Sequence, residues 1–163
     1  MNRQEKLDLI SKFESAYEVV EENIKDLPNE ALLFVPPIED AWSINDFLVH
    51  FLDADANLNL RLRGAIAEPG IATPAWDEEA WHARLHYEAQ DGKRCLELAK
   101  GIRAFLGRAL RSVVDEDWGA FYYTHPVKGK TELSALLATY RDHVAFHLAL
   151  IRRNKEAWQA RAR

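Results

Sequence analysis

The amino-acid sequence predicts an all-α protein, a four-helix bundle. Four long segments carry apolar residues at spacings of three and four, which is the period of an amphipathic helix. No segment shows the strict alternation that is typical of a half-buried strand, and proline or glycine separates the helical segments. Four such helices in a chain of 163 residues can bury their apolar faces against one another. We therefore expect a single four-helix-bundle domain over residues 1–163.

The first predicted helix covers about residues 3–26. Its apolar stripe comprises Leu7, Ile10, Phe13, Tyr17, Val20 and Ile24. The following stretch, "LPNEALLFVPPIEDA", contains Pro28, Pro36 and Pro37. Proline lacks a backbone N–H group and clashes with the preceding helical turn, so the helix is expected to end before this stretch.

The second predicted helix begins at "AWSIND" and runs to about residue 66. Ser43 is a typical N-cap, and Asp46 lies three residues further on, as in a capping box. Trp42 and Phe47 occupy the two positions of a hydrophobic staple, which fixes the angle at which the chain enters a helix.

The third predicted helix covers about residues 77–114. Asp77 can cap it, and Trp76 and Trp81 form a second candidate staple. We expect a bend near Gly92, because "QDGK" is a poor helix centre. After the long aromatic loop "DEDWGAFYYTHPVKGK", Thr131 is expected to cap the last helix, which runs to about residue 158.

Composition and charge exclude several classes of function. The net charge is −5 and the pI is near 5.7, which argues against a nucleic-acid-binding protein, because that class needs a positive surface. No apolar run approaches the roughly 20 residues that span a bilayer, and the start of the chain lacks the apolar core of a secretion signal. Cys95 has no second cysteine to pair with. We therefore expect a cytoplasmic protein without a membrane partner.

Two pairs of histidines have the i, i+4 spacing that lets two imidazoles reach one ion. In the last helix, His147 falls within about 30° of the centre of the apolar stripe and His143 within about 70°. In the third helix, His82 and His86 lie about 100° and 140° from the centre of the stripe. The first pair should face the interior of the bundle, and the second pair should face water.

His50 is a candidate third partner, because it lies about 100° from the centre of the stripe on the second helix. A residue on such a flank can meet a neighbouring helix, so His50 could join His143 and His147. Burying imidazoles without partners costs a few kcal/mol, and a shared cation would satisfy one nitrogen on each ring. Hydrogen-bonded structural histidines remain the alternative.

Other metal-site and nucleotide-site motifs do not fit the sequence. A zinc protease needs His-Glu-x-x-His, but Val144 follows His143 and Ala83 follows His82. A di-iron bundle needs two Glu-x-x-His motifs, and only Glu79 with His82 has this spacing. The sequence contains no glycine-rich phosphate loop and no G-x-S-x-G motif.

Two segments together, "AWSINDFLVHFLDAD" and "GKTELSALLATYRDHVAFHLALIRR", resemble the DinB/YfiT-like superfamily. The shared pattern is a Trp-Ser entry to the second helix, a histidine seven residues later, and a His-x-x-x-His pair in the last helix. The resemblance implies a homodimeric four-helix bundle in which His50, His143 and His147 bind a divalent metal. The characterised members of the superfamily that the chain resembles are metal-dependent enzymes. Several act with low-molecular-weight thiols, as S-transferases or isomerases, and some are described as hydrolases.

Three neutral imidazoles suit a zinc or nickel ion first, with manganese or iron as alternatives, and they leave coordination positions open. An open position can hold a water whose pKa falls towards about 7, or a thiolate. The predicted function is therefore a metal-dependent thiol S-transferase or hydrolase that acts on a small molecule. Asp53 and Tyr140 are the nearest polar candidates for supporting the site. The alternative is a non-catalytic structural or small-molecule-binding bundle whose histidines are vestigial.

Overall fold

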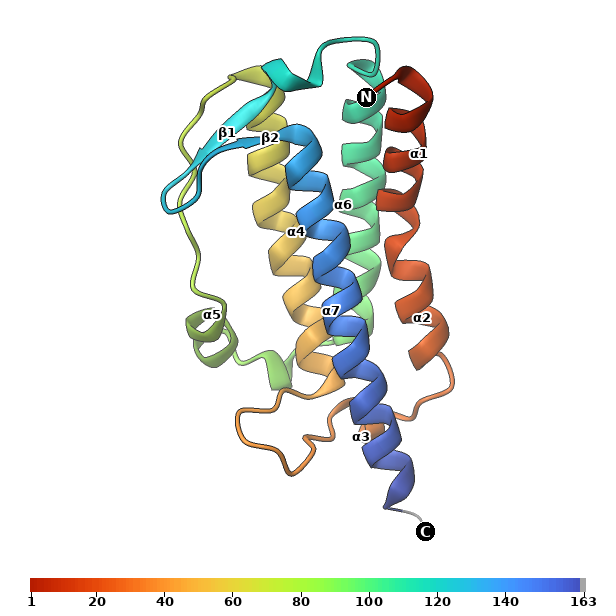
Figure 1. The fold of residues 1–163 in the computed structure, drawn as a ribbon. Helices are drawn as coiled ribbons and strands as arrows, with labels where there is room; N and C mark the ends of the chain where they lie inside the picture. The colour runs from red at the N-terminus through yellow and green to blue at the C-terminus, as the bar shows by residue number, and fades with distance from the viewer. Residues whose placement is uncertain (162–163) are drawn as a thin grey trace.

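A computed structural model describes residues 1–161 and shows four long helical columns lying side by side (Figure 1). This confirms the predicted four-helix bundle. The first column joins α1 to α2 through a short 3-10 turn, and two short helices, α3 and α5, lie outside the four columns. The bounds of the elements are α1 Arg3–Glu14, α2 Glu18–Ile24, α3 Asn29–Leu32, α4 Ile44–Ala67, α5 Glu78–Arg84, α6 Gly92–Ser112 and α7 Leu133–Ala160.

The start of α4 has the predicted capping arrangement. Ser43 Oγ accepts a hydrogen bond from the backbone N–H of Asp46 at 3.1 Å, and the backbone N–H of Ser43 donates to Asp46 Oδ2 at 2.9 Å. The rings of Trp42 and Phe47 lie 5.7 Å apart, as a hydrophobic staple requires. These contacts fix where α4 begins, and therefore which of its faces carries His50.

The predicted single helix over residues 77–114 is wrong, because the chain breaks there instead of bending. His86 adopts the left-handed conformation with φ of 52°, which a helix interior does not allow. The backbone N–H of Gly92 donates to Asn45 Oδ1 at 3.0 Å, and α6 then starts afresh with Asp91 as its N-cap. The separate helix α5 keeps the predicted Asp77 cap, and it lies beside α4 (Figure 1).

The expected absence of strands is also wrong. β1 (Tyr122–His125) pairs in antiparallel fashion with β2 (Gly129–Glu132), with Tyr122 opposite Glu132 and His125 opposite Gly129. Thr131 belongs to β2 and is not the predicted cap; α7 follows Glu132, whose side chain makes no capping hydrogen bond among the described residues. Tyr123 anchors the hairpin to the bundle, since its side chain is only 3% exposed.

A buried ion pair joins α4 to α6 inside the bundle. Asp55 and Arg103 are both fully buried, and two hydrogen bonds of 2.7 and 3.0 Å connect the guanidinium to the carboxylate. The guanidinium also donates to the hydroxyl of Tyr17 at 3.1 Å and lies over the same ring. The amphipathic pattern gave no sign of this pair, because both residues are charged and sit on helices with exposed faces.

Within residues 1–161, no helix is both long enough and apolar enough to cross a membrane.

Candidate metal centre

Three histidine side chains converge between α4 and α7. The Nε2 atoms of His50 and His143 lie 2.8 Å apart, and those of His143 and His147 lie 3.0 Å apart. The candidate ligand atoms of all three residues lie within 4.8 Å of one another. The structure thus brings together the three residues that the sequence pointed to. His143 and His147 share a face of α7 because they are four residues apart, and the flank of α4 supplies His50.

Burial keeps these imidazoles neutral. His50 is fully buried and His147 is 7% exposed, whereas His143 is partly buried. Loss of hydration lowers the pKa of His50 to about 3, with repulsion from His147 adding to the effect. The same two causes lower the pKa of His143 to about 2, and burial alone lowers that of His147 to about 4. At neutral pH all three rings are therefore in the form that binds metals.

The three rings fit a divalent ion. The Nε2 atoms, 2.8 and 3.0 Å apart, lie close enough together to share one ion, since zinc–imidazole bonds are about 2.0–2.1 Å long. The Nδ1 atom of each ring is buried and has no hydrogen-bond partner among residues 1–161. Each neutral ring carries one proton. When that proton is on Nδ1, the three Nε2 lone pairs face one another, and an ion would bind all three. A set of three neutral imidazoles suits a divalent transition-metal ion.

Aromatic packing holds the three imidazole rings in place. In many metal sites this role belongs instead to a hydrogen bond from the ring nitrogen that does not bind the metal. Trp76 stacks on His50 with ring centres 5.4 Å apart, and Trp42 meets the same ring edge-on, also at 5.4 Å. The ring centres of Phe47 and His147 lie 5.2 Å apart. Trp42 and Trp76 are each the first residue of one of the two staples identified in the sequence, so the residues that start α4 and α5 also form walls of the site.

Of the two predicted supporting residues, Tyr140 borders the histidines. Its ring centre lies 6.1 Å from that of His143, and its hydroxyl accepts a hydrogen bond from Arg61 at 3.3 Å. Burial raises the pKa of Tyr140 to about 12, so its hydroxyl keeps its proton. Asp53 instead accepts a hydrogen bond from the hydroxyl of Tyr87, and burial raises its pKa. Among the described residues, no hydrogen bond or ion pair links Asp53 to the three histidines.

The prediction that His82 faces water is wrong, although His86 is exposed as expected. The side chain of His82 is 27% exposed, stacks on Trp42 with ring centres 4.4 Å apart, and places Nε2 at 3.5 Å from Asp46. The helical wheel treated residues 77–114 as one helix. The break after Arg84 frees α5 to lie over the start of α4 and to bring His82 towards the site.

Glu78 is a site residue that the sequence reading missed. Its Oε2 atom lies 3.8 Å from His50 Nε2, while its side chain is 55% exposed. Partial burial raises its pKa, and the nearby charges of Glu79 and Asp77 add to the shift. No local signal marks this residue, because it looks like an ordinary acidic residue in the first turn of a helix.

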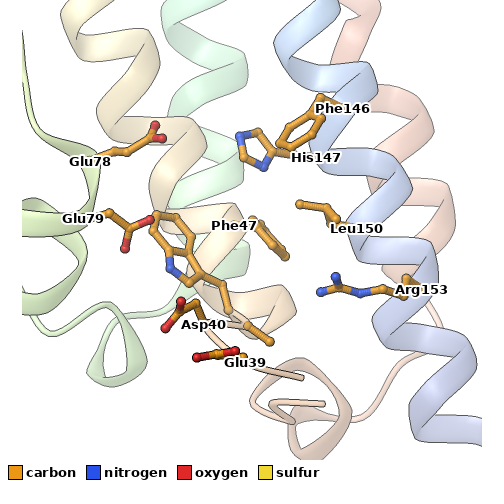
Figure 2. A pocket seen from close by; sticks show the side chains of 11 residues that line it. Glu39, Asp40, Phe47, Glu78, Glu79, Phe146, His147, Leu150 and Arg153 are labelled. Atoms are coloured by element: carbon orange, nitrogen blue, oxygen red, sulfur yellow. The ribbon is translucent and has the colours of Figure 1, made fainter. Parts of the chain in front are cut away.

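An open pocket of about 260 Å³ adjoins the histidine cluster. Figure 2 shows Glu78 and His147 pointing into it from opposite sides, with Phe146 beside His147. The rim is acidic, since Glu39, Asp40, Glu78 and Glu79 line it with a single arginine, Arg153. A second, smaller cavity of about 140 Å³ lies on the His143 side of Glu78. The cluster is therefore reachable from two openings of different chemical character.

The fold and the cluster together define a helical bundle with a buried three-histidine site. The family model of the DinB superfamily matches residues 12–151, and the chain belongs to this superfamily.

Comparisons with curated proteins and solved structures agree with this assignment. The chain is 23% identical over 141 residues to the "Putative metal-dependent hydrolase YfiT" of Bacillus subtilis (strain 168), covering 86% of this chain and 75% of that protein. It is 24% identical over 132 residues to the "Putative metal-dependent hydrolase GK0616" of Geobacillus kaustophilus (strain HTA426), covering 80% of this chain and 74% of that protein. The solved structure of the Bacillus subtilis YfiT protein superposes with a TM-score of 0.86 at 20% identity, covering 98% of this chain and 90% of that one. That likeness shows the fold.

Proposed function

We propose that this protein is a metal-dependent hydrolase of a small molecule, with a divalent ion held by His50, His143 and His147. The observation that carries the proposal is the convergence of three neutral imidazoles beside an open pocket. The Nε2 atom of His143 lies 2.8 Å from that of His50 and 3.0 Å from that of His147. Two similar proteins that carry the name "Putative metal-dependent hydrolase" support the choice of reaction.

A divalent ion in this place supplies Lewis acidity and lowers the pKa of bound water. The protein's own residues do the rest. The rings of Trp76 and Phe47 pack against His50 and His147 and cover part of the cluster from solvent. Glu78 Oε2, 3.8 Å from His50 Nε2, can accept a hydrogen bond at the mouth of the site and orient a water or a substrate group there.

Transfer of a low-molecular-weight thiol is the second candidate. The neutrality of the three histidines favours it. An ion bound only by neutral ligands keeps its full positive charge, and it can therefore attract a thiolate as well as a hydroxide. Zinc and nickel are the ions that we propose first, since both accept imidazole and thiolate ligands.

Elemental analysis of untagged protein reloaded with zinc or nickel tests the proposal. We expect one ion per chain in the wild type and a loss of metal in the triple variant His50→Ala/His143→Ala/His147→Ala. The matched control is His86→Ala, which removes an exposed histidine and should leave the metal content unchanged. Equal metal content in the wild type and the triple variant would contradict the site. Loaded protein that turns over no ester, amide or thiol–electrophile pair would favour the non-catalytic alternative.

We also propose that the protein forms a homodimer. Exposed apolar side chains on two neighbouring helices, Leu60 on α4 with Leu98 and Phe105 on α6, support this. Sedimentation equilibrium should give the mass of two chains, and the mass of one chain at micromolar concentration would contradict the proposal.

A further inference from the structure

The second cavity beside the histidine cluster contains a buried arginine without a counter-charge. Arg61 is 7% exposed, and no carboxylate oxygen lies within ion-pair distance of it among residues 1–161. Its guanidinium donates only to neutral acceptors, the Tyr140 hydroxyl and the backbone oxygen of Pro74, each at 3.3 Å. Buried charges in proteins are generally paired, because an unpaired charge loses its hydration without compensation.

A second buried arginine shows the contrast. Arg103 is fully buried, and it is matched by the buried carboxylate of Asp55 through two hydrogen bonds. Arg61, unlike Arg103, lines the smaller cavity beside His143. The cavity of about 140 Å³ is lined by Ala54, Arg61, Trp76, Glu78, Thr139, Tyr140 and His143.

Arg61 and Tyr140 form a pair of hydrogen-bond donors at this cavity. The Tyr140 hydroxyl uses its oxygen to accept from Arg61, so its own proton is free to be donated. A planar guanidinium with spare N–H groups next to a hydroxyl donor matches the two oxygens of a carboxylate or the oxygens of a phosphate. His143 lines the same space, so a group held there lies against the proposed metal centre.

The charges on the two sides of the site differ. Glu39, Asp40 and Glu79 line the larger pocket and are absent from the smaller cavity, where Glu78 is the one carboxylate among the lining residues. Glu78 is half-exposed and lies at the edge towards His50. The acidic rim repels an anion from the larger opening, and Arg61 attracts it to the smaller one.

We propose that the substrate carries a small anionic group, a carboxylate or phosphate, and that Arg61 and Tyr140 bind this group beside His143. The inference rests on the proposed function, because it assigns a substrate class to the same site. Arg61 and Tyr140 are then the residues that orient the substrate, and the reacting bond lies towards the histidines.

The experiment compares the binding of propionate with that of propionamide, its uncharged counterpart, by ligand-observed NMR. It uses full-length protein in both zinc-loaded and metal-free forms, so that direct coordination of propionate to zinc is separated from binding at Arg61. We expect propionate to bind at least ten-fold more tightly than propionamide in both forms. Arg61→Gln should remove this preference, and Tyr140→Phe should weaken propionate binding about three-fold.

The matched control is Arg63→Gln, since Arg63 lies two residues further along α4 and is exposed. It should bind propionate as the wild type does. Equal binding of propionate and propionamide would overturn the proposal. So would propionate binding that survives Arg61→Gln, which would assign the anion to the metal or leave Arg61 a purely structural role.

A second measurement covers the case in which Arg61→Gln does not fold. In wild-type protein, the Nε–H signal of Arg61 should shift as propionate is added, and an unchanged signal at saturation would overturn the proposal. The two proposals fail in different ways. Absence of stoichiometric metal defeats the metal centre but leaves the Arg61-dependent preference in metal-free protein intact. Loss of that preference with metal still bound defeats only the anion site.

Discussion

At the residue scale, the fold should be sensitive to the loss of the carboxylate that partners Arg103, because this guanidinium is fully buried. Replacing Asp55 with Asn leaves that charge buried with no carboxylate partner. Breaking a buried pair in this way typically costs about 3–5 kcal/mol of unfolding free energy. Urea denaturation measures the loss, and Glu97→Gln, which breaks the exposed pair with Arg94, serves as the control with little expected effect. A loss no larger than that of the control would show that the pair does not stabilise the fold.

The three buried histidines predict how the stability of the metal-free protein depends on pH. Each has an ordinary pKa of 6.5 when unfolded, and burial lowers it to between about 2 and about 4 in the folded chain. Below pH 6.5 the histidines of the unfolded state therefore bind protons, whereas those of the folded state stay neutral. The folded state loses stability as the pH falls towards about 4. Above pH 6.5 the contribution is complete and constant.

Urea denaturation between pH 7.5 and 4.5 checks this dependence. The metal-free wild type should lose more unfolding free energy over this range than the variant His50→Gln/His143→Gln/His147→Gln, because glutamine does not titrate. His86→Gln should follow the wild type, since His86 is exposed. Parallel curves for the wild type and the triple variant would mean that the three rings are not buried as neutral groups.

At the scale of an element, the break before α6 depends on Gly92. A Cβ atom at this position would lie 2.5 Å from Asn45 Oδ1 and 3.0 Å from its backbone oxygen, so Gly92→Ala should displace the Asn45 side chain from its hydrogen bonds and crowd the start of α6 against α4. Overpacking of this kind costs about 1–3 kcal/mol. Gly101→Ala, in the interior of the same helix, meets no atom within 4 Å and should stabilise the protein by up to about 1 kcal/mol. Thermal unfolding distinguishes the two, and a stabilising Gly92→Ala would show that this close approach is not required.

The helix α5 shows how one break changes a functional site. Its Asp77 cap and its Trp76–Trp81 pair, with ring centres 5.2 Å apart, follow the sequence pattern. Its position does not, because the chain turns at His86 and carries His82 and Glu78 towards α4. The helical wheel is reliable only within one uninterrupted helix.

At the scale of the whole molecule, metal binding should stabilise the fold, because the unfolded chain does not hold three histidines together. Zinc at one hundred times its Kd contributes about 2.7 kcal/mol. For a chain of this size that corresponds to a rise in Tm of about 5–11 °C. Differential scanning calorimetry should show the rise in the wild type and in His86→Ala, and should show little of it in His147→Ala. An equal rise in all three proteins would place the zinc elsewhere.

Local regularities in the sequence determined most of the helical segments and the three histidines of the site. The period of three and four residues, the Ser43 cap and the i, i+4 spacing of His143 and His147 act within one or two turns of the chain, and the structure has all of them. His50 could be proposed as their partner because its place on a helical flank is also a local property.

Only the tertiary structure decided which distant residues meet. The contact of Asn45 with Gly92 breaks the third helix, the packing of Tyr123 permits a hairpin, and Arg61 reaches Tyr140 across 79 positions of sequence. These pairings depend on how closely two backbones approach and on which polar groups lose their water, neither of which has a periodic signature. The sequence therefore identified the face of the bundle that carries the three histidines, while the fold supplied Glu78, Arg61 and the two openings through which a substrate would reach the proposed metal centre.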